Sequence, residues 1–346
     1  SATGPRMHVA YLLDSPTYGG AEISVVQLLR HLPAGVRCTV VAPHPVPVLL
    51  AAAARRRGEL VTVALTDLDR SLRDLDPDLV HAHLIDPASN RTLIEAAGRR
   101  RGIATVHMIG HLSDDPTGLR DAYARLFAVI AVSREIAALL IDDLGLPAPL
   151  VRRVRNGVEP LPVVERTERT PLVVGGLGRL TAQKGFDLLV QAACRLLAEG
   201  HRLRVRIAGE GRDRDTLTRQ AAGLPVSLVG FQEDVRRYLA SVDLFAMPSR
   251  AEALPLALLE AMMTGLPCVA TEVGDIRDEL DGAVLLIPPE DPDALTAALR
   301  RLLTDARLRR DLGERAAALA HCDFRVDRTV SDVHAIYLNV AADTRR

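Results

Sequence analysis

The segment Gly178–Gly185 combines the residue types that phosphate binding requires. It has a glycine at each end and carries Arg179 and Lys184 between them. Lys184 is the single lysine among 43 Lys and Arg residues, so a compact ammonium stands where the chain otherwise uses arginine. The segment precedes a predicted helix, whose first N–H groups attract anions. Solvated surface charges are the alternative, but we predict that Arg179 and Lys184 bind a phosphate group.

Two carboxylates, Glu252 and Glu260, flank the start of another predicted helix. Pro255 suits the first position of that helix, which leaves Glu252 in the preceding loop. From Pro255 to Glu260 a helix rises about 8 Å, close to the length that separates the two sugars of a sugar nucleotide. Because carboxylates accept hydrogen bonds from hydroxyls, the pair is suited to such a ligand. Glu260 could instead face solvent, although its helix is apolar nearly all round.

A third loop, Asp14–Glu22, joins the first predicted strand to the first predicted helix. Gly19 and Gly20 allow a ligand to approach the backbone there, or they serve only a tight turn. The dinucleotide pattern GxGxxG is absent from this loop, which argues against a nicotinamide-dependent dehydrogenase.

Strand-length apolar runs alternate with amphipathic segments along the whole chain, a pattern typical of α/β proteins with parallel sheets. Ligands of such sheets bind at the carboxyl ends of the strands, where the three loops lie. We predict an N-terminal domain at 7–160, a linker at 161–171, a second domain at 172–322 and a polar helical segment at 323–346. The predicted strands are His8–Leu13, Arg37–Ala42, Leu60–Ala64, Asp78–His81, Ile103–His107, Ala128–Val132, Val151–Val154, Leu172–Gly176, Arg204–Ala208, Val226–Val229, Leu244–Met247, Pro267–Ala270 and Ala283–Ile287.

Composition narrows the function classes. The 346 residues are 48% hydrophobic and 25% charged with a net charge of −1, which excludes a disordered chain and argues against a nucleic-acid partner. The apolar run Val46–Ala54 is too short to span a membrane, and we expect no stable membrane attachment. The four scattered cysteines predict buried thiols. Reduced thiols and the lack of a recognisable export signal favour a cytoplasmic location.

Nine short motifs in order resemble the retaining glycosyltransferases of the GT-B fold, in particular family 4, over nearly all of Met7–Tyr337. Each motif alone is weak, but their order is specific. The motifs are Gly19–Glu22, Pro77–His83, Val106–His107, Ala131–Ser133, Arg155–Glu159, Gly178–Gly185, Ala208–Gly211, Leu228–Phe231 and Glu252–Met262.

The resemblance implies two Rossmann-like domains that face each other across a cleft, with the acceptor on the first, the sugar nucleotide on the second, and the C-terminal helix crossing back to the first. It implies neither a metal nor another cofactor. Arg179 and Lys184 would then bind the diphosphate, Glu252 the donor sugar and Glu260 the ribose, with His107 at the reacting sugar. Together, His107, Arg179, Lys184 and Glu252 form the expected catalytic group. The other expected donor-binding residues are Gly19, Gly20, Gly209, Phe231, Leu254 and Leu256.

One position departs from the family pattern. Pro255 stands where many members have glycine, and it has no N–H to offer a ligand. One backbone contact to the donor is therefore in doubt.

The expected reaction moves a sugar from a nucleotide sugar to a hydroxyl of a small soluble acceptor, such as an amino sugar or aminocyclitol of a natural-product pathway. Family frequency favours UDP over GDP or ADP. The acceptor prediction rests on loops that carry acids and histidines and few arginines. Helix N-caps are the alternative reading of these aspartates. The residues are Asp14, Asp86, His107, His111 and Asp114.

Two other functions fit the same fold. A non-hydrolysing sugar-nucleotide 2-epimerase would release no nucleotide when it is given a donor and an acceptor. A sugar-binding protein without catalysis would normally carry an export signal. The histidines at 81, 83, 107 and 111 also suggest a metal site, but packing and hydrogen bonding explain His81 and His83 more simply.

Overall fold

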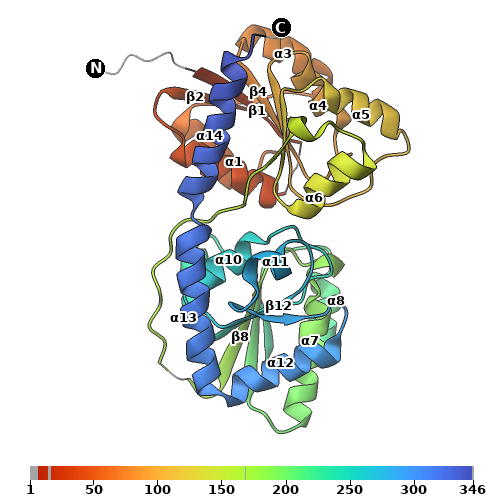
Figure 1. Cartoon of the computed structure of the whole chain (residues 1–346). Helices are drawn as coiled ribbons and strands as arrows, with labels where there is room; N and C mark the ends of the chain where they lie inside the picture. Colours follow the sequence, from red (N-terminus) through yellow and green to blue (C-terminus); the bar gives the residue numbers. More distant parts are fainter. Residues whose placement is uncertain (1–6, 15–16, 168, 345–346) are drawn as a thin grey trace. The chain divides into compact units, whose positions relative to one another are not determined.

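The computed structural model describes residues 7–14, 17–167 and 169–344 and divides the chain into two compact units (Figure 1). The first unit runs to Asn156 and resumes at Val326, and the second unit is Gly157–Arg325. Both are α/β, with helices packed on a parallel sheet, and a strand overlaps each strand predicted from the sequence. They are two Rossmann-like domains.

The described part of the first unit contains a seven-stranded sheet of order β3-β2-β1-β4-β5-β6-β7. Central β4 is longer than predicted and buried throughout, as expected for a strand that helices cover on both faces, so it also contains His83. The strands are β1 (Met7–Leu12), β2 (Val36–Ala42), β3 (Glu59–Thr62), β4 (Leu79–Leu84), β5 (Gly102–Val106), β6 (Ala128–Ala131) and β7 (Val151–Arg153). The helices are α1 (Gly20–His31), α2 (Val48–Arg57), η1 (Leu65–Asp67), α3 (Leu68–Leu75), α4 (Arg91–Gly98), α5 (Pro116–Ala124), α6 (Arg134–Ala138), η2 (Leu139–Asp143) and η3 (Ala148–Leu150).

The second unit contains a six-stranded sheet of order β10-β9-β8-β11-β12-β13 within the described residues. Its strands are β8 (Leu172–Leu177), β9 (Leu203–Ala208), β10 (Val226–Gly230), β11 (Leu244–Met247), β12 (Cys268–Thr271) and β13 (Leu285–Ile287). Its helices are η4 (Ala182–Lys184), α7 (Phe186–Ala198), α8 (Arg214–Gln220), α9 (Val235–Ala240), α10 (Leu256–Met263), α11 (Ile276–Leu280), α12 (Pro292–Thr304) and α13 (Ala306–Asp323).

The last helix, α14 (Val326–Ala342), belongs to the first unit, where Figure 1 shows it beside α1. It begins at Val326, after α13 has ended at Asp323, whereas the sequence suggested one polar segment from Asp323. Its Val330, Val333 and Tyr337 recur at helical spacing and are buried in the core of the first unit. Only the opposite face of α14 is polar.

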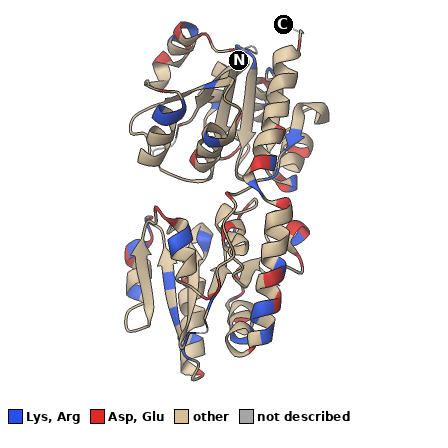
Figure 2. Cartoon of the chain, turned by 90° about the vertical axis from the view of Figure 1, so that its left-hand side faces the viewer, with Lys and Arg blue, Asp and Glu red and all other residues tan. Residues whose placement is uncertain are grey.

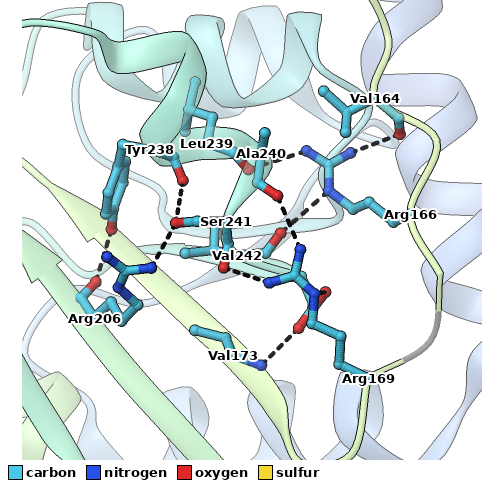
Figure 3. Close-up of polar contacts among 11 residues, drawn as sticks. Val164, Arg166, Arg169, Val173, Arg206, Tyr238, Leu239, Ala240, Ser241 and Val242 are labelled. Carbon is cyan, nitrogen blue, oxygen red and sulfur yellow. Dashed lines mark hydrogen bonds and ion pairs between the residues drawn. The ribbon is translucent and has the colours of Figure 1, made fainter.

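Two arginines attach the segment before β8 to the end of helix α9 in the same unit (Figure 3). Arg166 donates to the carbonyl oxygens of Leu239 and Val242, both at 3.2 Å, and Arg169 donates to those of Ala240 at 3.0 Å and Ser241 at 2.7 Å. The last carbonyls of a helix have no partner within the helix, so these guanidinium groups cap the end of α9. Burial of the Arg166 side chain lowers its pKa to about 10. The contacts fix the residues that lead directly into β11.

The cysteine prediction was half wrong. Cys38 and Cys268 are buried, but Cys194 and Cys322 are exposed, because Cys194 lies on the face of α7 that is turned away from the core. In the view of Figure 2, basic and acidic segments are interspersed on helices of both units, as the balanced net charge leads one to expect. Across the described residues, no helix combines the length and apolarity that a membrane crossing requires.

Candidate functional site

The loops that carry the phosphate-binding and carboxylate motifs follow strands β8, β9 and β11, which are neighbours in the sheet. Their backbones lie in close contact. Gly209 has φ +135°, and a Cβ on it would lie 1.8 Å from the Gly178 carbonyl oxygen. Gly185 has φ +66°, and a Cβ there would lie 2.0 Å from the Pro248 oxygen. Both positions therefore require glycine for the packing of the protein itself.

Lys184 and Glu252 meet in a buried ion pair. The Lys184 Nζ lies 2.5 Å from the Glu252 Oε1, and the side chains are only 14% and 4% exposed. The Ser249 hydroxyl donates to the same oxygen at 2.8 Å. The sequence assigned these two residues to different parts of a ligand, and the structure brings them into direct contact.

Arg250, which the sequence analysis did not single out, holds this pair in place. Its guanidinium group binds both oxygens of Asp187 at 2.9 and 2.8 Å, at the start of α7, and donates to the Ala182 carbonyl oxygen at 2.6 Å. Its backbone N–H donates to the Gln183 oxygen at 2.7 Å. The loop of Glu252 is thereby attached to the loop of Lys184. In the sequence Arg250 is one arginine among many, so its type gave no signal.

The Arg250 guanidinium group also binds Glu290, whose Oε1 lies 2.8 Å from the arginine Nε. Glu290 has φ +55°, a left-handed conformation that is costly for a residue other than glycine. The hydrogen bonds from Arg250 lower the pKa of the Asp187 carboxyl, and those carboxylates raise the pKa of Arg250 further above its usual value. Strained backbone commonly persists at functional sites, where surrounding contacts impose it.

The other predicted donor-binding residues of the second unit differ in their burial and contacts. Arg179 is half-buried, and its guanidinium group has no hydrogen-bond or ion-pair partner among the described residues. Phe231, after β10, is 49% exposed, whereas Leu254 is 2% exposed. Pro255 is the N-cap of α10, so the helix begins one residue later than predicted, at Leu256.

Glu260 lies inside α10, half-buried. Desolvation raises the pKa of its carboxyl from 4.5 to about 7. A carboxyl group with a pKa near 7 changes its charge within the pH range in which most enzymes work.

In the first unit, three predicted acceptor residues follow the adjacent strands β1, β4 and β5. Asp14 accepts a hydrogen bond from the Asn90 amide, and Asp86 packs against Gly110, where a Cβ would lie 2.5 Å from the Asp86 Cβ. Asp86 also accepts from the Ala88 N–H at 3.0 Å and so forms a local turn, whereas the N-cap of the following helix α4 is Asn90. His107 follows β5 on the same edge.

The remaining predicted residues of the first unit make fewer contacts with the described protein. The His111 Nε2 lies 3.4 Å from the Asp114 Oδ1, and these side chains are 80% exposed and fully exposed, respectively. Gly19 is the N-cap of α1, and a Cβ on Gly20 would meet no described atom within 4 Å. Protein packing therefore gives no reason for glycine at position 20. Ser15 and Pro16 of this loop lie outside the described residues.

Three histidines of the first unit are buried side by side. The ring centroids of His81 and His83 are 4.2 Å apart, and those of His83 and His107 are 5.3 Å apart. Desolvation lowers the pKa of all three, to about 3 for His81, to about 4 for His107, and well below the usual value for His83. They are therefore neutral at pH 7. The described residues contain no group of three or more His, Cys, Asp or Glu side chains arranged to hold a metal ion.

This burial predicts acid sensitivity of the fold. An unfolded histidine binds a proton near pH 6.5 and the buried ones do not, so their stabilising contribution is complete above pH 6.5 and is lost as the pH falls from 6.5 towards 4. We expect the free energy of unfolding in urea to fall by about 1.4 kcal/mol per pH unit for each such histidine. His107→Asn should reduce this slope, and His111→Asn, at an exposed site, should not. Equal slopes in the wild type and His107→Asn would contradict the assignment.

Comparisons with known proteins match this chain to glycosyltransferases, both in sequence and in fold. The family model "Glycosyltransferase Family 4" matches residues 18–160, and "Glycosyl transferases group 1" matches residues 171–305. In the Anabaena protein HepE, whose crystal structure contains UDP and glucose, the fold superposes with a TM-score of 0.80 at 19% identity, covering 96% of this chain and 99% of that one.

Two curated relatives are similar in sequence. The exopolysaccharide phosphotransferase of Streptomyces coelicolor is 30% identical over an alignment of 333 residues, and the match covers 90% of this chain but only 33% of that protein. The alpha-D-kanosaminyltransferase of Streptomyces kanamyceticus is 28% identical over an alignment of 271 residues, and the match covers 69% of this chain and 70% of that protein. The family 4 model lies within the first unit apart from its last four residues, and the group 1 model lies within the second unit, in the order that the nine motifs predicted. The chain therefore belongs to the GT-B glycosyltransferases of family 4, also called group 1.

Proposed function

We propose that this protein is a metal-independent glycosyltransferase that moves a sugar from a UDP-sugar to a hydroxyl group, with retention of configuration at the anomeric carbon. The contact between Lys184 and Glu252 is the observation that carries this proposal. In a nucleotide sugar the outer phosphate and the sugar are joined by one bond. A cation for the phosphate and a carboxylate for the sugar hydroxyls, 2.5 Å apart, match that junction.

In the proposed reaction the bond between the anomeric carbon and the outer phosphate breaks, and negative charge builds on that phosphate. Lys184 and the unpartnered Arg179 stabilise the charge, with the N-terminus of α10 as a further positive end. The acceptor hydroxyl attacks from the face that the diphosphate leaves, and its proton passes to the departing phosphate. No enzymic nucleophile is required.

The acceptor is proposed to be a small hydroxylated molecule, such as an amino sugar or aminocyclitol, bound at the edge of the first unit. Asp14, Asp86 and His107 support this because they supply acceptors and an imidazole to one edge of the sheet. The relative named alpha-D-kanosaminyltransferase, after an amino sugar, supports the same class. A role in natural-product synthesis and a cytoplasmic location remain predictions from the sequence.

A panel of sugar nucleotides tests the donor. Because ligand that binds the folded state raises the melting temperature, we expect UDP-sugars to stabilise the protein more than GDP- or ADP-sugars. Donor plus a polyhydroxylated amine acceptor should release UDP at a rate that EDTA leaves unchanged. No stabilisation by any sugar nucleotide would contradict a donor site, and epimerised donor without UDP release would indicate a 2-epimerase.

Glu260 should make donor binding dependent on pH. We propose that its carboxylate accepts hydrogen bonds from the ribose hydroxyls, and protonation removes acceptor capacity. Since its pKa is about 7, the KM for the donor should rise as the pH falls from 8 to 6, while kcat changes little.

Glu260→Gln is the matched variant for this prediction because it keeps the shape and cannot ionise. We expect a higher KM that no longer varies with pH in this range. If wild type and Glu260→Gln showed the same pH dependence of KM, the assigned role of Glu260 would be wrong.

A further inference from the structure

His83 lies between two other buried imidazoles: its ring contacts that of His81, and it hydrogen-bonds to His107. The two nitrogens of His81 are both occupied, by the Tyr337 hydroxyl at 2.6 Å and the Thr105 hydroxyl at 2.7 Å. His83 uses its Nδ1 for the His107 Nε2, at 3.0 Å. These rings stack with an interplanar angle of 20°, so His107 has a defined orientation.

The remaining nitrogen of each ring differs in its surroundings. The His83 Nε2 is buried and has no hydrogen-bond partner among the described residues. The His107 Nδ1 also lacks a partner there, but it is not one of the buried unpartnered atoms, and 7% of the residue remains exposed. Of the two free nitrogens, the His107 Nδ1 is therefore the one that a ligand can reach.

The hydrogen bond between the His83 Nδ1 and the His107 Nε2 contains one proton, which either ring could donate. Each neutral ring carries only one proton, so the choice of donor also decides the state of the other two nitrogens. If His107 donates, the proton of His83 lies on its buried Nε2 as an N–H without an acceptor. If His83 donates, its Nε2 is a bare acceptor. Orphaned buried N–H groups are rarer in folded proteins than unpartnered acceptors, so the second arrangement is favoured.

We propose that His83 is a positioning residue that donates from Nδ1 to His107 and thereby keeps the proton of His107 on its Nδ1. His107 then presents an N–H to an oxygen atom of a bound sugar, and its only lone pair is already engaged by His83. It serves as a hydrogen-bond donor and not as a general base. The assignment to a sugar ligand rests on the proposed function, whereas the tautomer does not.

The tautomer is measured on the protein without substrate, by nitrogen NMR of histidine-labelled wild type at pH 7. We expect protonated Nδ1 and unprotonated Nε2 for His107, assigned with His107→Asn. His83→Phe keeps a stacking ring without a donor, so the unprotonated Nε2 of His107 loses its hydrogen bond, and we expect the fraction of His107 with its proton on Nδ1 to fall. His83→Asn keeps an amide donor near the Nδ1 position and should retain the wild-type tautomer. Protonated Nε2 on His107 in the wild type would overturn the proposal whatever the protein's activity.

Kinetics then test the role of that donor. His83→Phe should lower kcat/KM about tenfold, and His83→Asn should restore most of the loss. His201→Phe, which lies before β9 and so at the opposite end of that strand from Gly209, should have no effect. The pH profile of the wild type should show no ionisation of His107 near 6.5, since its imidazole stays neutral. Unchanged kcat/KM in a folded His83→Phe would refute the positioning role. Absence of sugar-nucleotide binding would instead count against the proposed function and leave the measured tautomer intact.

Discussion

Lys184→Met is expected to lower kcat by about 10² to 10³ while the KM for the donor changes little. The ammonium stabilises charge that grows on the leaving phosphate only as the bond breaks, so its loss falls on the transition state. Steady-state kinetics with the UDP-sugar chosen by the binding panel would measure the effect. A raised KM with unchanged kcat would contradict this role.

Stability must be separated from catalysis in this variant. Glu252 is 4% exposed on its side chain, and removal of its partner leaves a buried carboxylate with the Ser249 hydroxyl. Breaking such a pair typically costs about 3–5 kcal/mol. The double variant Lys184→Met/Glu252→Gln removes both charges and should recover most of the melting temperature without recovering kcat. Recovery of both would mean that the single variant was inactive because it was poorly folded.

Arg250→Met is expected to lower kcat/KM by about 10² although Arg250 need not touch the substrate. Its side chain fixes the loop of Glu252 to Ala182 and Asp187, which flank Lys184 in sequence. Displacement of a reacting group by about 1 Å can cost a factor of this size. Arg250→Lys should give an intermediate value, because lysine keeps the charge without the two-pronged geometry.

Arg300→Met provides a matched control. Arg300 binds the two oxygens of Glu199 at 2.8 and 2.7 Å, the same type of contact as that between Arg250 and Asp187, on an exposed surface between α7 and α12. The Arg300→Met variant should leave kcat/KM unchanged, and its melting temperature shows how much stability is lost with such an ion pair. A similar fall of kcat/KM in both variants would rule out a specific role for Arg250.

The sequence by itself determined the alternation of strands and helices, and with it the two parallel sheets. Strand-length apolar runs such as Leu244–Met247 are buried on both faces in a parallel sheet and stand out without any tertiary information. The helix that was predicted after Gly185 is α7, and its buried residues recur at helical spacing. Glycines and charged residues after strands also predicted which loops bind a ligand.

The sequence did not determine which side chains meet. Lys184 and Glu252 are 68 residues apart, and only the adjacency of β8 and β11 in the sheet brings their loops together. The same adjacency gives Arg250 its partners, none of which a sequence pattern identifies. The strand order β4-β5 likewise stacks His83 on His107. Local propensity acts over a few residues, so it sets the elements, whereas contacts between loops depend on strand order, which only the packed fold decides.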